Sequence, residues 1–272
     1  MVTQRFFIED GHLLETTQFQ PNTGIEIYEV IRVIRGIPLF TGDHLKRFYH
    51  SAWLCHQEIP VDEDTIRCCL KTLIRSNGVE EGNIRFSWCF HPAGKFQAYF
   101  IPHFYPGPEM MEKGVECELL SAERPDPNAK VVHANLRDKA NQLISEKGVY
   151  EVLLLNTRGE FTEGSRSNLF FLKQGCVVTS PTEEVLPGIT RQKILHWLSV
   201  SGKPVEFRNL PLEELPGTEG AFLTGTSPKI LPISMIGDVR FPVISPVIRE
   251  IMEAYDRMIE ADIQENMERY SD

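Results

Sequence analysis

From residue 162 to residue 170 the chain reads Thr-Glu-Gly-Ser-Arg-Ser-Asn-Leu-Phe, a run of small and polar residues beside two apolar segments. These segments, residues 151–156 and 168–172, have the composition of strands. A plain hairpin connection needs about two to five residues, so the longer polar run between them is more than a turn. It embeds one carboxylate, that of Glu163, among glycine and hydroxyl groups.

Two further turns in the second half of the chain carry glycine and hydroxyl groups. Residues 186–191, Leu-Pro-Gly-Ile-Thr-Arg, lead into a helix predicted over residues 190–199. At such an entry, backbone N–H groups and the helix dipole favour an anion. Residues 224–227, Thr-Gly-Thr-Ser, follow a predicted strand. Together with the embedded carboxylate, the two turns indicate a ligand that bears a phosphate.

Motifs of several common enzyme classes are absent from the sequence. It contains no GxGxxG, GxxxxGK[ST], HExxH or GxSxG pattern. No local motif therefore indicates a nucleotide-binding, zinc-protease or hydrolase function. The six cysteines show no CxxC or Cys/His spacing. We therefore predict no metal site.

Composition and charge define the broad class of the protein. The chain has 272 residues, 42% of them hydrophobic, which is enough for one large domain or two smaller ones. A net charge of -10 argues against nucleic-acid binding. The first residues are interrupted by charge too soon for a signal peptide, and no apolar run approaches the ~20 residues of a membrane helix. We expect a soluble, cytoplasmic protein without a membrane partner.

The pattern of predicted elements divides the chain into two domains. Residues 1–121 combine strand-like segments with two helices, the second over residues 61–77 and capped by Asp62 or Asp64, which indicates an α+β domain. Residues 122–129 contain two prolines and have the composition of a linker. Residues 130–272 form the second predicted domain. Within it we predict helices over residues 134–147 and 246–269.

From about Ile25 to Gly237 the chain resembles the class IV aminotransferases, the fold-type-IV pyridoxal phosphate (PLP) enzymes. This family includes branched-chain aminotransferases, D-amino acid aminotransferases and aminodeoxychorismate lyase. The resemblance rests on five ordered segments, residues 28–32, 44–48, 163–170, 186–191 and 224–226. It implies a small α+β N-terminal domain, a larger C-terminal domain built as a pseudo-barrel, PLP between them, and a homodimer.

The resemblance also implies a lysine that forms a Schiff base with PLP, soon after the linker. Counting back about 18 residues from Gly148, as the family spacing requires, leads to Lys130. Lys139 is the alternative, but it falls inside the predicted helix and stands 24 residues before Glu163 (163 − 139), against 33 for Lys130 (163 − 130). The residues after Lys130, Val-Val-His-Ala-Asn, depart from the Lys-x-Leu-Asn pattern of the lyase and D-amino acid branches.

Other cofactor-binding residues follow from the same resemblance. Glu163 matches the carboxylate that pairs with the pyridine nitrogen, and Arg47 matches the arginine that binds the phosphate. Leu186 is expected to pack against the ring, and Arg166 to add positive charge near it. The phosphate cup is completed by Ile189, Thr190 and Thr226.

The substrate signals point in two directions. Tyr28, with the Glu-Val that follows it, resembles the D-amino acid enzymes, whereas Arg85 lies where branched-chain enzymes use an arginine on the substrate carboxylate. Arg32 is the third residue expected to contact substrate. The resemblance therefore predicts transfer of an amino group between an amino acid, branched-chain L or D, and a 2-oxo acid. Two alternatives remain open, a β-elimination like that of aminodeoxychorismate lyase and a non-enzymatic PLP-fold binding protein.

Overall fold

The computed structural model describes residues 2–91, 94–124, 127–130, 134–241 and 245–270. The chain divides into two compact units. Unit 1 comprises Met1–Phe104, Ala129–Val132 and Met258–Asp272, and unit 2 comprises Tyr105–Asn128 and His133–Arg257. Lys130 thus belongs to unit 1, although it follows a segment of unit 2.

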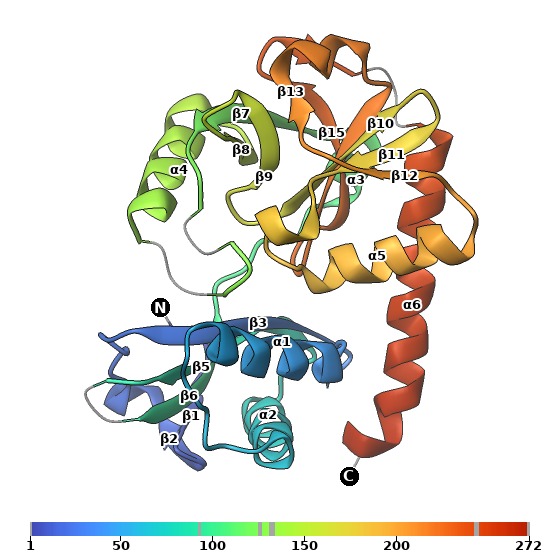
Figure 1. Ribbon diagram of the computed structural model, residues 1–272. Helices are drawn as coiled ribbons and strands as arrows, with labels where there is room; N and C mark the ends of the chain where they lie inside the picture. The colour runs from blue at the N-terminus through green and yellow to red at the C-terminus, as the bar shows by residue number, and fades with distance from the viewer. Residues whose placement is uncertain (1, 92–93, 125–126, 131–133, 242–244, 271–272) are drawn as a thin grey trace. The chain divides into compact units, whose positions relative to one another are not determined.

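Unit 1 is an antiparallel sheet with two helices on one face (Figure 1). Its described strands run in the order β2-β1-β6-β5-β3-β4. Their bounds are Phe6–Glu9 (β1), His12–Glu15 (β2), Glu26–Ile34 (β3), Ile37–Pro38 (β4), Glu81–Cys89 (β5) and Lys95–Ile101 (β6), and the helices are η1 (Thr16–Gln18), α1 (Thr41–Leu54) and α2 (Glu63–Asn77). Apolar residues of α1 and α2 pack on alternate residues of the strands, such as Ile27 and Ile31 of β3.

The other face of this sheet carries the residues predicted to contact substrate. Side chains alternate along a strand, so Tyr28 and Arg32 lie opposite to Ile27 and Ile31. Arg85 pairs with Val30 across the β3–β5 register and therefore shares the face of Tyr28. The sheet thus collects all three predicted residues on one side.

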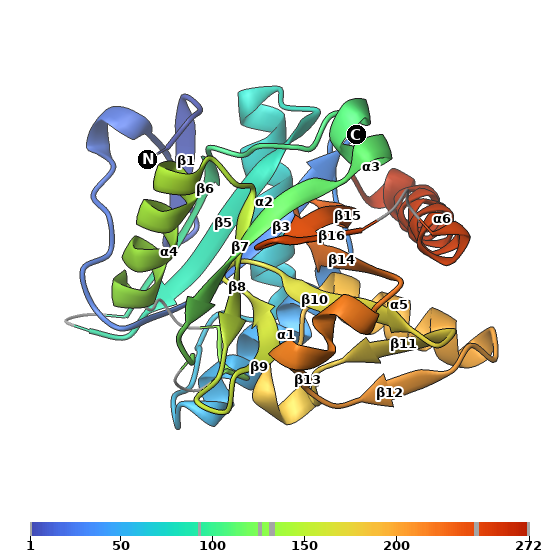
Figure 2. The ribbon, with the colours of Figure 1, turned by 90° about the horizontal axis from the view of Figure 1, so that it is seen from above.

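Unit 2 is built on a long, curled sheet (Figure 2). Its described strands run in the order β12-β11-β10-β14-β15-β7-β8-β9-β13, and β16 pairs with β15. The strand bounds are Val115–Ser121 (β7), Glu151–Leu155 (β8), Glu160–Gly164 (β9), Asn168–Lys173 (β10), Cys176–Thr179 (β11), Val205–Phe207 (β12), Leu210–Pro211 (β13), Gly220–Gly225 (β14), Lys229–Ile236 (β15) and Val239–Arg240 (β16). The apolar side chains of these strands form a second core, which includes Leu153, Phe171 and Leu223.

Helices of unit 2 lie along this sheet. They are α3 (Pro108–Lys113), α4 (Ala134–Lys147), η2 (Thr182–Glu184), α5 (Ile189–Val200) and η3 (Leu212–Gly217). The last helix, α6 (Pro246–Tyr270), contributes residues 246–257 to unit 2 and residues 258–270 to unit 1. Within the described residues, no helix is long and apolar enough to span a membrane.

The structure confirms several predicted helices and strands and differs from the prediction at two strands, β9 and β7. Helix α4 has the predicted bounds, and α6 ends one residue later than predicted. Glu163 lies on strand β9, which the sequence analysis missed because its polar residues hide the alternation. Strand β7 pairs in parallel with β8 and β15 of unit 2, so residues 115–121 do not join the sheet of unit 1. Within the predicted linker of residues 122–129, the chain passes from unit 2 to unit 1 between Asn128 and Ala129.

The N-cap of α2 allows a direct test of one sequence alternative. Asp62, not Asp64, is the cap, and its carboxylate accepts a hydrogen bond of 2.7 Å from the Thr65 N–H. Asp62→Ala is expected to lower the free energy of unfolding, because this N–H then loses its partner. Urea denaturation measures the loss. Asp64→Ala is the matched control and should cost less, and an equal or larger loss there would contradict the assignment.

Candidate functional site

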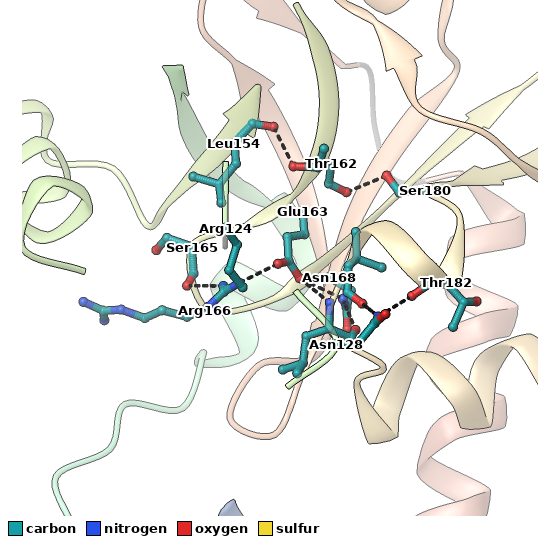
Figure 3. Close-up of polar contacts among 12 residues, drawn as sticks. Arg124, Asn128, Leu154, Thr162, Glu163, Ser165, Arg166, Asn168, Ser180 and Thr182 are labelled. Carbon is teal, nitrogen blue, oxygen red and sulfur yellow. Dashed lines mark hydrogen bonds and ion pairs between the residues drawn. The ribbon is translucent and has the colours of Figure 1, made fainter. Parts of the chain in front are cut away.

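Strand β9 presents a buried carboxylate that several groups hold in place. Glu163 is 3% exposed. Its Oε1 accepts a hydrogen bond of 2.8 Å from Arg124 Nε, and its Oε2 accepts bonds of 3.2 Å from Asn168 Nδ2 and from the Leu186 N–H (Figure 3). Arg124 compensates the negative charge and also donates to the Ser165 carbonyl at 3.3 Å. The carboxylate is therefore fixed in direction as well as buried.

Asn168 connects this carboxylate to the turn that enters α5. Its Nδ2 also donates to the Leu186 carbonyl at 2.9 Å. A Cβ at Gly188 would collide with Asn168 Oδ1, so the close approach of the two segments requires glycine. On the other side, Asn128 donates to the carbonyls of Thr182 and Val185 at 2.7 and 2.8 Å. Side-chain amides thus hold both ends of the segment before α5.

A second buried carboxylate, that of Glu151, lies under the turn between β9 and β10. Glu151 is 3% exposed. Its Oε1 accepts from the Val152 N–H at 2.9 Å and from Ser165 Oγ at 2.7 Å, and its Oε2 accepts from the Arg166 N–H at 3.2 Å and from Ser167 Oγ at 3.0 Å. Each carboxylate oxygen thus accepts one hydrogen bond from a backbone N–H, which is always a donor, and one from a hydroxyl. This carboxylate sets the path of the turn that follows Glu163.

The N-terminus of α5 has the features of an anion site. Helix α5 begins at Ile189 after Gly188, which has no side chain to cap it. The first N–H groups of a helix have no partner within the helix, and its dipole favours negative charge there. Thr190 is buried, with Oγ1 3.0 Å from the Tyr255 hydroxyl. Thr224 Oγ1, directly before the Gly225-Thr226 turn, is buried and has no hydrogen-bond partner among the described residues.

Arg191, in the first turn of α5, is a buried cation. It is 1% exposed and donates to the Ser180 carbonyl at 2.7 Å and to Thr182 Oγ1 at 3.2 Å. Burial lowers the pKa of Arg191 to about 10, while the charges of Glu163 and Glu183 act in the opposite direction. The guanidinium stays protonated at neutral pH and adds positive charge to the region of Glu163.

In unit 1, Lys130 lies beside Tyr28, one of the predicted substrate residues. Its N–H donates to Ser51 Oγ at 3.3 Å, and its carbonyl accepts from the Tyr28 N–H at 3.3 Å. The Tyr28 ring has Lys130 Nζ at 5.2 Å from its centroid and Arg85 Cζ at 4.1 Å. By contrast, Lys139, the alternative lysine, lies inside α4, where the sequence analysis placed it, and is exposed. Unit 1 therefore brings Lys130, Tyr28 and Arg85 together.

Arg47 is placed by a buried network on the helix-covered face of the sheet. Its Nε and Nη2 donate to Glu29 Oε1 and Oε2 at 2.7 and 2.6 Å, and His44 Nδ1 lies 2.8 Å from Oε2. Burial opposes ionisation of Glu29, but the charge and hydrogen bonds of Arg47, helped by His44, lower its pKa to about 2. Burial lowers the pKa of His44, against the opposing effect of Glu29. Helix α1 is thereby fixed to β3 by an ion pair.

Three further residues predicted to bind cofactor or substrate are Arg166, Arg32 and Thr226. The guanidinium of Arg166 points away from Glu163 and bonds to Asn141 of α4 (Figure 3). Arg32 and Thr226 are half-buried, on β3 and in the turn after β14. Sequence reasoning missed Arg124 and Glu151. Arg124 stands in a polar, proline-rich segment that resembles an exposed linker, and Glu151 was interpreted as the start of a strand.

Comparison with known proteins identifies the family. The sequence profile described as "Amino-transferase class IV" matches residues 26–236, well over half of the chain. The chain belongs to the class IV aminotransferase family. The resemblance found in the sequence motifs is thereby confirmed.

Individual relatives and structures of this family agree with the assignment. The chain is 25% identical over 259 residues to "Branched-chain-amino-acid aminotransferase-like protein 1" of Arabidopsis thaliana, a match that spans 87% of this chain and 46% of that protein. It is 26% identical to "D-alanine aminotransferase" of Bacillus licheniformis, over 78% of this chain and 79% of that one. The crystal structure of the T.th. branched-chain amino acid aminotransferase with pyridoxamine 5'-phosphate superimposes with a TM-score of 0.86 at 23% identity, covering 98% of each chain. The fold-type-IV class IV aminotransferase fold is therefore confirmed.

The hydrogen bonds of Glu151 predict the effect of an isosteric substitution. In Glu151→Gln, either orientation of the amide places an NH₂ group against a backbone N–H, of Val152 or of Arg166. We expect a loss of about 1–3 kcal/mol in the free energy of unfolding, measured by urea denaturation. Glu116→Gln, at an exposed position on β7, is the control and should change stability by less than about 0.5 kcal/mol. Equal effects of the two substitutions would contradict the role of Glu151.

The lowered pKa of Glu29 predicts a pH dependence of stability. The folded protein keeps this carboxylate ionised down to a pKa of about 2, whereas the unfolded chain takes up the proton near the ordinary value of 4.5. The ion pair therefore stabilises the fold above about pH 4.5, and this contribution is lost as the pH falls toward about 2. Glu29→Gln should be less stable than wild type at pH 7, and the difference in urea midpoint should narrow below about pH 4.5. A difference that stays constant down to about pH 3 would show that Glu29 does not titrate in this way.

Proposed function

We propose that this class IV aminotransferase uses PLP to move an amino group between an amino acid and a 2-oxo acid by a ping-pong mechanism. The observation that carries the proposal is the buried Glu163 carboxylate, held by Arg124 and Asn168 next to the helix entry at Gly188. A fixed carboxylate beside a group of anion-binding N–H donors matches a ligand with a basic ring nitrogen at one end and a phosphate at the other.

The donor set of unit 2 fits PLP. The entry to α5 offers backbone N–H groups and a helix dipole for the phosphate, and the unpartnered Thr224 Oγ1 and the Thr226 turn add hydroxyl donors nearby. We assign Ile189, Thr190 and Thr226 to the phosphate, with Leu186 against the ring. Glu163 would accept a hydrogen bond from the protonated ring nitrogen. When bound, PLP supplies an electron-accepting ring that stabilises negative charge at the substrate α-carbon.

Unit 1 supplies the reactive amine and the carboxylate receptor in this proposal. Lys130 holds the cofactor through its amine and moves the proton at the substrate α-carbon. Tyr28, whose ring contacts both Arg85 and Lys130, is assigned to the substrate carboxylate together with Arg85 and Arg32. Arg47 is assigned to the cofactor phosphate, in an orientation determined by Glu29. Arg166, whose side chain lies along α4, would contribute long-range positive charge.

The proposed amino donor is a branched-chain L-amino acid or a D-amino acid, the two classes that the names of the relatives represent. Superposition on a structure that contains pyridoxamine 5'-phosphate supports the choice of cofactor. We further propose, from the family resemblance and the composition, that the protein acts as a cytoplasmic homodimer. The β-elimination and non-enzymatic alternatives have no observation in their favour.

Spectroscopy tests the proposal and the choice of lysine together. Titration with PLP should give wild type an absorbance band near ~400 nm, and D-alanine, D-glutamate, L-leucine or L-glutamate should remove it if it is a donor. Lys130→Ala should lack the band because it has no amine to bind the cofactor. Lys139→Ala, which changes an exposed lysine on α4, should keep it.

Three results would overturn parts of this proposal. Loss of the band in Lys139→Ala, with retention in Lys130→Ala, would reverse the lysine assignment. Release of pyruvate from aminodeoxychorismate, with no transfer to any 2-oxo acid, would establish the lyase alternative. A wild-type protein that forms no band with PLP would favour a non-enzymatic role.

A further inference from the structure

An ion pair between Glu26 and Arg85 lies on the face of the unit 1 sheet that is opposite to α1 and α2. Glu26 is the first residue of β3, and Arg85 lies on the neighbouring strand β5. Their side chains are 13% and 17% exposed, so water screens the pair only in part. Asn22 Nδ2 donates to Glu26 Oε2 at 3.3 Å and holds the carboxylate from its other side.

Arg85 is held in one orientation by its neighbours. Its guanidinium lies over the Tyr28 ring, and it faces Tyr99 across the β5–β6 register. Lys95, a cation on the adjoining strand, is itself paired with Glu9 at 3.4 Å. Glu26 therefore compensates the charge of Arg85, and Lys95 is compensated separately by Glu9.

The Tyr28 ring links this compensated pair to the proposed reactive lysine. Arg85 Cζ and Lys130 Nζ both approach the Tyr28 ring, at 4.1 and 5.2 Å from its centroid. A substrate attached near Lys130 Nζ would present its remaining groups to this face of the sheet. Glu26 and Arg85 form an acid–base pair on that face.

We propose that Glu26 is a specificity-determining residue that disfavours substrates with a second carboxylate. The inference rests on the proposed aminotransferase function. Arg85 with Glu26 forms a nearly neutral pair, so one carboxylate finds a donor while the negative charge of Glu26 remains close by. A second carboxylate in this partly buried region meets Glu26 as a like charge, where attraction and repulsion are stronger than in water. A neutral side chain meets no such repulsion.

A pair of 2-oxo acids of equal length measures this discrimination. 2-Oxopentanoate carries one carboxylate and 2-oxoglutarate carries two, and neither has a stereocentre at C2, so the preferred enantiomer does not enter. We convert the holoenzyme to its pyridoxamine phosphate form and measure kcat/KM for each acceptor. In Glu26→Gln the ratio of 2-oxoglutarate to 2-oxopentanoate should rise by about fivefold or more over wild type, chiefly through a lower KM for 2-oxoglutarate.

Two variants control for effects other than charge. Glu26→Asp keeps the carboxylate and should keep the ratio within about twofold of wild type. Glu15→Gln removes the acid of the exposed Arg5–Glu15 pair on the same sheet and should leave the ratio unchanged. If Glu26→Gln does not fold, as judged by circular dichroism, Glu26→Ala takes its place with the same expected rise.

The outcomes separate this inference from the proposed function. If wild type transfers the amino group to either acceptor but removal of the Glu26 charge raises the ratio by less than about fivefold, or lowers it, the role of Glu26 is wrong and the aminotransferase function stands. If wild type transfers to no 2-oxo acid, the proposed function fails and the role of Glu26 falls with it. A rise that Glu26→Asp shares would also overturn the inference, because the charge would then not be its cause.

Discussion

The carboxylate of Glu151 is the constraint on which the arrangement of unit 2 depends. It binds three consecutive residues, Ser165 to Ser167, and so fixes the turn between β9 and β10. Glu163 and Asn168 lie at the two ends of this turn, and Asn168 in turn holds the Leu186 carbonyl before α5. One buried acid thereby controls the distance between the Glu163 carboxylate and the helix N-terminus. Among the described residues this buried carboxylate has no salt bridge, and four hydrogen-bond donors replace its water.

Unit 1 uses the two faces of a single strand for two different tasks. Glu29 points from β3 to α1, where its ion pair with Arg47 binds helix to sheet. The adjacent residue, Tyr28, points to the opposite face of the sheet, where its ring contacts Arg85 and Lys130. The Lys130 carbonyl accepts a hydrogen bond from the Tyr28 N–H, so the backbone of β3 also positions the lysine. Strand alternation thus places Tyr28 and Glu29, which are neighbours in the chain, on opposite faces of the sheet.

The parts of this structure that depend on local pattern could be predicted from the sequence, and the parts that depend on distant contacts could not. Helices α4 and α6 follow from apolar spacing, and strands β8 and β10 from short apolar runs. Family motifs located Glu163, but its partner Arg124 is 39 residues away in a segment that resembles a linker. Strand β7 pairs in parallel with β8 and β15. Parallel strands are joined by long connections, so no turn motif in the sequence predicts which strands pair. The role of Glu151 is likewise visible only when β8 and the β9–β10 turn are side by side.

Charge compensation limits how strongly the arginines of this chain, which has a net charge of -10, can attract an anion. Three arginines of the two units, Arg47, Arg85 and Arg124, are each paired with a glutamate. Pairing lets these cations be buried, but it also weakens their attraction for a further anion. The binding of an anionic ligand must therefore depend more on neutral donors, such as the N–H groups at the start of α5, than on net positive charge. Neutral donors act over short distances and fixed directions, so they discriminate by geometry, whereas each acidic partner repels any additional carboxylate. The selectivity of such a site among anionic ligands depends on the positions of the glutamates as much as on those of the arginines.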